Sequence, residues 1–388
     1  MPPVRLVVFT GKGGVGTTTT AAATAARAAG QGLKTLLLSV GSSLADVLAT
    51  SVGAEPAEVA AGLFAQRIDP RQVAARVWDP VRTMLPAALD DLGLDPVGAE
   101  DLADLPGLDA LLTLVAVREQ VHDGPWDLVV LDCPAAFEVF AVPAQLERLL
   151  LRLLPMERRI DRLTARGMTG DPLVTAVDGL ARELASVRSM LSGARVRLVL
   201  TPEATVLAHS RRLFTALVLS GLTVDAVVAN KVFPPGVPGD RGGWPESRRD
   251  RQQELLEETS AFGVPVQRVE YAPGEPAGVR ALAALEVPDG LSAPEGLPAP
   301  EGQVDPDGRI ERTGTGFTLH LALPLARRDD LDLGRRGDDL VITAAGYRRV
   351  LHLPAALRRC EVTGASLRDG TLAVRFVPDP AQFPARWV

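Results

Sequence analysis

A glycine-rich loop between a strand-like and a helix-like segment constrains the fold of this chain more than any other feature. The apolar, β-branched run at residues 4–10, VRLVVFT, is typical of a short buried strand, and the alanine-rich run at 18–30 is typical of a helix. The loop between them reads Gly11-Lys12-Gly13-Gly14-Val15-Gly16-Thr17-Thr18-Thr19. In this setting backbone N–H groups close around phosphates, and the helix N-terminus adds the positive end of its dipole. The pattern predicts a P-loop nucleotide-binding site, with a purely structural turn as the alternative.

Further apolar segments have the length and composition of buried strands, at residues 34–39, 127–132, 195–200 and 224–230. Helical stretches separate them, among them residues 203–219 after the turn at Thr201-Pro202. Apolar strands that alternate with helices indicate a parallel sheet that is covered on both faces. The predicted fold of residues 1–287 is therefore an α/β, doubly wound P-loop NTPase domain.

Two insertions, at residues 66–122 and 143–191, interrupt this alternation and have a helical period. Their strongest apolar stripe consists of Leu146, Leu149, Leu150, Leu153 and Leu154, which are spaced one and two helical turns apart. We predict that both insertions belong to a helical subdomain that stands on the sheet.

The C-terminal part has a different period. Residues 288–308 are rich in proline, glycine and acidic residues, which predicts an extended linker. Beyond the linker, apolar residues alternate with others, as at Phe317, Leu319, Leu321 and Leu323. Turn signals at Gly337-Asp338 and Asp369-Gly370 separate such runs. The sequence predicts a small antiparallel β-sandwich over residues 309–388.

Charge and cysteine content argue against several classes of function. The formal net charge of −7 disfavours nucleic acid as a partner, so the arginine pairs 211–212, 335–336 and 358–359 are interpreted as solvated faces. The two cysteines, Cys133 and Cys360, lie far apart and cannot form a CxxC zinc site.

No apolar stretch approaches roughly 18 residues, and no signal sequence precedes the first strand. We expect a cytoplasmic protein without stable membrane insertion.

The loop departs from the usual P-loop at position 17, where a lysine normally reaches the β- and γ-phosphates. Thr17 occupies that place, while Lys12 stands at the second loop position. This form resembles the deviant P-loop of the ATPases related to MinD, the arsenite-pump subunit ArsA and the tail-anchored-protein targeting ATPase. The resemblance spans residues 4–286. It implies that ATP or ADP binds with Mg²⁺, that the protein forms a homodimer or heterodimer, and that Lys12 acts in trans on the partner's nucleotide.

Two switch segments of that family are altered. The family's Asp-Pro-Ala-His-Ser-Leu segment contains an Asp that orients the attacking water, and residues 39–48, SVGSSLADVL, lack it. Asp46 stands at a different place and is not interpreted as a base. At the end of the segment 127–132, the resemblance assigns Asp132 to a Mg²⁺ site that Thr18 shares, while a helix-capping Asp is the alternative. Cys133 is interpreted as a small buried side chain.

The part of the family pattern that recognises the base is retained. Thr201-Pro202-Glu203 matches, and Asn230, followed by Lys231, corresponds to the family's adenine-contacting residue. Pro106-Gly107-Leu108-Asp109 resembles the segment before the family's switch-bearing strand. The zinc and arsenite-binding cysteines of the family have no counterparts. Because loss of a phosphate-bound cation in a site of low dielectric costs several kcal/mol, we expect a slow ATPase or a pseudo-ATPase.

Two further parts of the chain bear on partners. In the targeting ATPases, insertions like those predicted here form an apolar groove for a client helix, and Met156, Met168 and Met190 would add adaptable side chains to one. Packing in a core is the alternative role of the leucine stripe. The predicted sandwich resembles the α-crystallin-like domain that follows some ArsA-type ATPases, with matches at 333–342, 346–354 and 369–376.

Three functions remain as hypotheses. The first is a degenerate ArsA-like protein that binds ATP or ADP weakly and acts in a dimer as a chaperone or targeting factor for a hydrophobic polypeptide. The second is an active ATPase that uses Lys12 as its phosphate lysine. The third is a scaffold that no longer binds nucleotide.

Overall fold

The computed structural model describes residues 4–76, 108–133, 172–234, 244–287, 308–314 and 316–381. Contacts divide the chain into two units, and each is described by itself. Unit 1 comprises residues 1–9, 17–194 and 275–285, and unit 2 comprises residues 10–16, 195–274 and 286–388.

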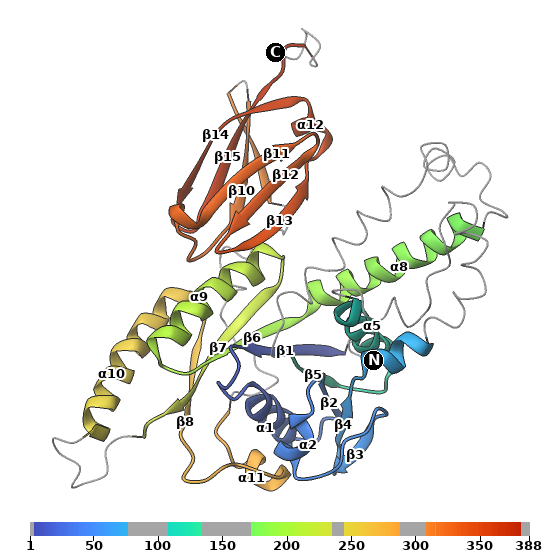
Figure 1. Ribbon diagram of the computed structural model, residues 1–388, viewed down its shortest axis with the longest axis vertical. Helices are drawn as coiled ribbons and strands as arrows, with labels where there is room; N and C mark the ends of the chain where they lie inside the picture. Colours follow the sequence, from blue (N-terminus) through green and yellow to red (C-terminus); the bar gives the residue numbers. More distant parts are fainter. Residues whose placement is uncertain are drawn as a thin grey trace. The chain divides into compact units, whose positions relative to one another are not determined.

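The strands of unit 1 hydrogen-bond in the order β3-β4-β2-β5-β1 (Figure 1). Their bounds are Arg5–Gly11 for β1, Thr35–Ser39 for β2, Ala57–Ala60 for β3, Leu63–Arg67 for β4 and Leu128–Asp132 for β5. All pairs are parallel except β3 with β4. Every residue of β2 and β5 is buried, which is why these strands are continuous apolar runs and not alternating ones.

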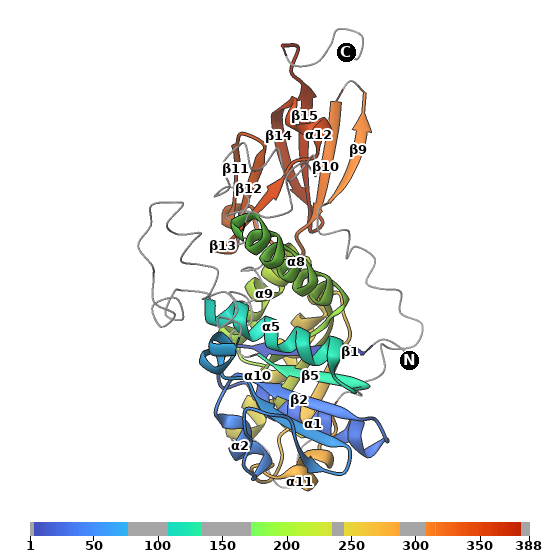
Figure 2. The ribbon, with the colours of Figure 1, turned by 90° about the vertical axis from the view of Figure 1, so that its right-hand side faces the viewer.

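Helices cover both faces of these strands. Their bounds are Thr17–Gly30 for α1, Ser43–Leu48 for α2, Leu108–Asp123 for α5, Pro172–Gly193 for α8 and Val279–Ala283 for α11. Figures 1 and 2 show α1 and α11 on one face and α5 and α8 on the other, and α1 packs directly on α11 and on β5. Small side chains let α1 approach the strands closely, since its alanines from Ala21 to Ala26 are buried.

Unit 2 contains a second parallel run, β6-β7-β8. The strands span Arg195–Leu200 (β6), Thr223–Val232 (β7) and Val266–Glu270 (β8), and the helices span Ala204–Leu219 (α9) and Trp244–Glu258 (α10). The short 3-10 helix η1, Thr259–Phe262, contacts both helices. These elements and those of unit 1 form the predicted α/β fold with parallel strands.

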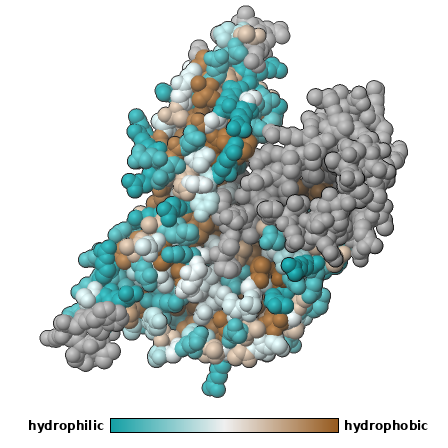
Figure 3. All heavy atoms as spheres, viewed as in Figure 1, coloured by the Kyte–Doolittle hydropathy of each residue, from teal (hydrophilic) through white to brown (hydrophobic). Residues whose placement is uncertain are grey.

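The C-terminal part of unit 2 is a β-sandwich of two antiparallel sheets, β14-β15-β10-β9 and β11-β12-β13. Strand bounds are Arg309–Thr313 (β9), Gly316–Ala322 (β10), Leu331–Arg336 (β11), Asp339–Ala344 (β12), Tyr347–His352 (β13), Cys360–Arg368 (β14) and Thr371–Pro378 (β15), with short helical turns at Arg328–Asp330 (η2) and Ala355–Arg358 (α12). The predicted period of two holds in β10, where Leu319 and Leu321 face a shared core. Figure 3 shows hydrophobic side chains along the middle of the visible face of the sandwich, between hydrophilic margins.

The last turn of α9 packs into this sandwich. Leu219 is 2% exposed and belongs to the sandwich core cluster. The Thr215 hydroxyl donates to the Pro324 carbonyl at 2.6 Å, and the Arg349 guanidinium of β13 donates to the Leu219 carbonyl. The end of α9 therefore supplies part of the hydrophobic core of the sandwich.

Most predicted elements are present, and three strands were missed. Strands β3, β4 and β8 have no counterpart in the prediction, and β4 ends at Arg67, beside the predicted start of the first helical insertion at about residue 66. The interpretation of Arg335 as part of a solvated face is wrong. Its half-buried guanidinium donates to the carbonyls of Gly337, Arg358 and Cys360, so these bonds and not water satisfy it.

Several predictions lie outside the described residues. They concern the stripe from Leu146 to Leu154, Met156, Met168 and most of the linker at 288–308. The proposed domain boundaries stay predictions. Among the helices of the described ranges, none combines the length and hydropathy that a membrane crossing requires.

Candidate functional site

The glycine-rich loop, Gly11–Gly16, has a backbone that side chains would disturb. A Cβ on Gly11 would lie 2.3 Å from the Val199 carbonyl oxygen of β6. Gly16 has φ +91°, and a Cβ there would lie 2.3 Å from the Asn230 side-chain nitrogen. The sequence needs glycine at these positions because the loop is packed tightly against β6 and β7.

Two adjacent side chains at the end of β7 hold this loop. Asn230 Nδ2 donates to the Val15 carbonyl at 2.8 Å, and Lys231 Nζ donates to the Gly14 carbonyl at 2.9 Å. Asn230 is 7% exposed. The structure therefore brings the two residues predicted for nucleotide binding onto the predicted phosphate loop, although 215 residues separate Asn230 from Val15.

Thr17, which stands where a P-loop lysine is usual, and Lys12, the lysine of this loop, differ in exposure. Thr17 is 5% exposed, and its carbonyl accepts the Thr20 hydroxyl at 3.0 Å within α1. Lys12 is exposed. Burial, the charge of Arg212 and the charge of Lys12 lower the pKa of His209 on α9, so Lys12 lies within electrostatic reach of that helix.

A carboxylate cluster lies within unit 1 at the end of β5. Asp132 is 1% exposed, and the Ser39 hydroxyl at the end of β2 donates to its Oδ2 at 2.8 Å. Thr18, from the first turn of α1, approaches the Ser43 hydroxyl to 3.5 Å. Parallel strands β2 and β5 are paired Ser39 to Asp132, which places both residues at the same edge of the sheet.

Asp132 is a buried carboxylate with one oxygen that the described residues leave unpaired. Burial raises the pKa of its carboxyl, while the hydroxyls of Ser39 and Thr18 lower it. Its Oδ1 has no hydrogen-bond partner among the described residues. A buried acceptor left unpaired is costly, and a bound Mg²⁺ or a water of its shell would satisfy it. The residues present therefore fit Mg²⁺, which prefers oxygen ligands and keeps several waters.

Two neighbours of the cluster have no sign of catalytic chemistry. Cys133 is 2% exposed, and burial together with the charge of Asp132 raises the pKa of its thiol to about 12. The prediction of a small buried side chain is confirmed. Asp46 lies in α2 and is exposed, and the hydroxyl that donates to Asp132 comes from Ser39.

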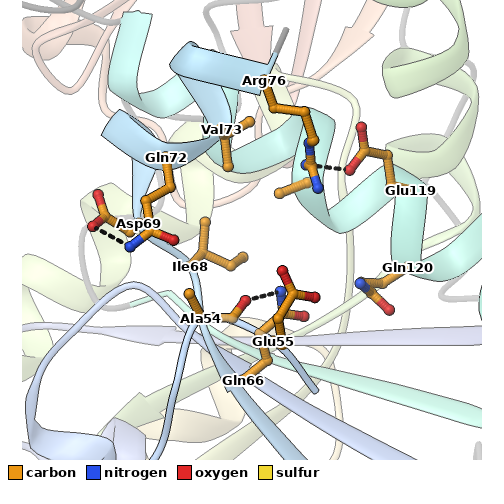
Figure 4. A pocket seen from close by; sticks show the side chains of 11 residues that line it. Ala54, Glu55, Gln66, Ile68, Asp69, Gln72, Val73, Arg76, Glu119 and Gln120 are labelled. Atoms are coloured by element: carbon orange, nitrogen blue, oxygen red, sulfur yellow. Dashed lines mark hydrogen bonds and ion pairs between the residues drawn. The ribbon is translucent and has the colours of Figure 1, made fainter.

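A pocket of about 120 Å³ lies in unit 1, and its lining includes no residue of the glycine loop (Figure 4). Its polar groups largely satisfy one another, since Arg76 pairs with Glu119 at 2.5 Å and Gln66 donates to the Ala54 carbonyl at 2.7 Å. Its wall is formed by Ala54, Glu55, Gln66, Ile68, Asp69, Gln72, Val73, Arg76, Ala116, Glu119 and Gln120. This pocket contains none of the predicted site residues.

Sequence reasoning did not single out two residues of the site. Ser39 is predicted as the end of a strand and the start of the altered switch segment, with no role at Asp132, and Gln252 of α10 is not among the predicted residues. Gln252 is 6% exposed and bonds the backbone on both sides of β7's end, at Lys231 and Phe233. A serine and a glutamine carry no motif, so a contact in the folded chain was needed to find them.

Known proteins resemble the chain over both parts. Residues 4–287 match the family described as "Anion-transporting ATPase", and residues 314–376 match the "HSP20-like domain found in ArsA". An uncharacterized protein of Streptomyces coelicolor is 38% identical over 98% of this chain and 99% of its own length. A protein of Mycobacterium tuberculosis is 32% identical over 98% of this chain and 97% of its own length. A protein of Prosthecochloris vibrioformis that carries the name of an arsenical pump-driving ATPase is 28% identical over 96% of both chains.

Proposed function

Because the chain belongs to the anion-transporting ATPase family, we propose that it is a nucleotide-binding member whose hydrolytic site is impaired. It binds ATP or ADP weakly, forms a dimer, and handles a hydrophobic polypeptide client. The α/β domain provides the nucleotide site, and the HSP20-like sandwich follows that domain in the chain.

The observation that carries this proposal is the buried threonine at position 17. The loop keeps its glycine backbone and its contacts with Asn230 and Lys231, which supports nucleotide binding. Thr17 offers no positive charge to the γ-phosphate. A cation aimed at the charge that develops in phosphoryl transfer is worth about 10²–10³ in rate or more, so binding survives its loss better than hydrolysis does.

Mg²⁺ bound with the nucleotide would neutralise phosphate charge in this site. Thr18 would offer its hydroxyl to the ion, and Asp132 would hold it through Oδ1, directly or through a water. Ser39 would keep the carboxylate in place by its hydrogen bond to Oδ2.

The exposed ammonium of Lys12 supports a role at a dimer interface. A lysine directed at a partner's nucleotide needs to be accessible, and the Lys12 residue is exposed while its carbonyl accepts the Val15 N–H within the loop. We assign Lys12 to the partner's phosphates. The client role rests on the family resemblance of the helical insertions, and the partner is a second copy or a related ATPase.

The test compares the wild type with Thr17→Lys and, as the matched control, Thr17→Ser. ATP binding is measured by equilibrium dialysis, and turnover is measured as phosphate release with Mg²⁺. We expect bound nucleotide but slow turnover in the wild type and in Thr17→Ser, and turnover about 100-fold faster in Thr17→Lys.

Two results would contradict the proposal. Fast Mg²⁺-dependent turnover by the wild type that survives Lys12→Ala would show that the site hydrolyses ATP with other groups. Absence of bound ATP and ADP at millimolar ligand would instead make the chain a scaffold.

A further inference from the structure

Lysine is rare in this chain, which makes the position of each lysine informative. Of 41 basic residues, three are lysines: Lys12, Lys34 and Lys231. The ammonium of Lys34 lies over the rings of Phe64 and Trp126, at 5.4 and 5.3 Å from their centroids. The other two are at the glycine loop, one within it and one bonded to it. The lysine ammonium is a compact point charge with three rotatable donors, unlike the planar arginine fork.

Lys231 is held in a backbone conformation that costs energy. Its φ is +58°, in the left-handed region that residues other than glycine rarely adopt. Strain of this kind persists where the surroundings fix the conformation, and it is concentrated at functional sites. The strain places the side chain toward the loop, where Nζ lies 2.9 Å from the Gly14 carbonyl oxygen.

Gln252 supplies the restraint that keeps Lys231 in place. Its Nε2 donates to the Lys231 carbonyl at 3.2 Å, and its Oε1 accepts the Phe233 N–H at 2.9 Å. One bond holds the carbonyl of the strained residue itself, and the other holds the backbone two residues further along the chain. Because Gln252 is 6% exposed, water competes little for these bonds.

The geometry points to Lys231 as a cation that favours binding of the nucleotide's phosphates from the end of β7, with Gln252 as its positioning residue. The inference deepens the proposed function and rests on it. The ammonium touches the backbone of the loop that binds the phosphates. A bound nucleotide displaces water around this half-buried side chain, which strengthens its attraction for the added negative charge.

A charge that acts on the phosphates changes ligand affinity in a different way from a residue that only supports the loop. Its contribution grows with the number of phosphates on the ligand and shrinks as salt screens it. A residue that only supports the loop changes the affinity for adenosine, AMP, ADP and ATP by the same factor. The ligand series therefore separates the two roles.

The experiment measures the Kd of adenosine, AMP, ADP and ATP by equilibrium dialysis at low and high salt. The variants are Lys231→Met, Lys231→Arg and Lys231→Asn, the last because asparagine tolerates positive φ and guards against misfolding. Lys34→Met is the matched control for loss of one positive charge. We expect Lys231→Met and Lys231→Asn to weaken ATP binding at least about tenfold at low salt and adenosine binding less than about twofold.

Further arms complete the test. Lys231→Arg keeps most of the ATP affinity, Lys34→Met shows no dependence on phosphate number, and Gln252→Leu reproduces the pattern of Lys231→Met in weaker form. Equal losses across the four ligands, or no loss with Lys231→Met, overturn the inference and leave the nucleotide site intact. A wild type that binds none of the four ligands overturns the proposed function together with it.

Discussion

Replacing Asp132 by asparagine is expected to stabilise the ligand-free protein while weakening its binding of Mg²⁺ with nucleotide. The carboxylate is 1% exposed, accepts one hydrogen bond from Ser39 on Oδ2, and leaves Oδ1 unpaired among the described residues. Asparagine keeps the acceptor for Ser39 and removes the buried charge. A group kept for ligand binding commonly costs stability when the ligand is absent.

The expected gain follows from the unpaired oxygen. A buried polar group without its partner costs about 1–3 kcal/mol, and more when it is charged. The asparagine amide is itself only partly satisfied at this place, so we expect a net gain of about 1–2 kcal/mol. For a domain of this size each kcal/mol raises the melting temperature by about 2–4 °C. The variant should therefore melt about 2–8 °C higher than the wild type without ligand.

The stability difference between the wild type and Asp132→Asn should depend on pH. Burial raises the folded-state pKa of the Asp132 carboxyl above its unfolded value. The ionised group therefore destabilises the fold at neutral pH, and that cost disappears as the pH falls through the folded pKa. The stability advantage of Asp132→Asn should be largest at neutral pH and should shrink in acid.

Thermal melts across pH, with and without Mg²⁺–ATP, measure both effects. Asp46→Asn is the matched control, because Asp46 is exposed and the charge change is the same. A lower melting temperature for ligand-free Asp132→Asn at neutral pH would refute the reasoning, and so would an equal gain in Asp46→Asn.

Three other perturbations follow from the packing. Gly11→Ala should lower the free energy of unfolding by about 1–3 kcal/mol in urea melts, because its Cβ would meet the Val199 carbonyl oxygen at 2.3 Å. Leu219→Ala should cost about 2–5 kcal/mol in the same assay, because Leu219 is buried in the core of the sandwich. Cys133, with a thiol pKa of about 12, should resist thiol reagents at mildly alkaline pH until the protein unfolds.

Each of these has a contrary result, and the first has a matched control. Gly13→Ala meets no atom within 4 Å and should change stability little, so equal losses at Gly11 and Gly13 would contradict the packing argument. A mild effect of Leu219→Ala would mean that the sandwich core does not depend on α9. Rapid labelling of native Cys133 would mean that the thiol is accessible and ionised more readily than its burial allows.

Local patterns in the sequence determined the strand–loop–helix unit, the buried strands and the period-two sandwich. Strands β2 and β5 are continuous apolar runs, and such runs are readable because burial on both faces excludes polar residues. Strands β3 and β8 were missed because they are short and mostly exposed or half-buried, with charged residues among them. Their pairing comes from neighbours in the sheet and not from their own pattern.

The sequence also predicted the glycine loop, Asn230, Lys231 and Asp132 as site residues, and it showed threonine at position 17. Only the tertiary structure decided what these residues touch. Lys231 reaches the Gly14 carbonyl across 217 residues of sequence, and Gln252 fixes its strained backbone. Hydrogen bonds between distant segments depend on how the strands pair and where the helices pack, and a linear pattern does not encode that geometry residue by residue.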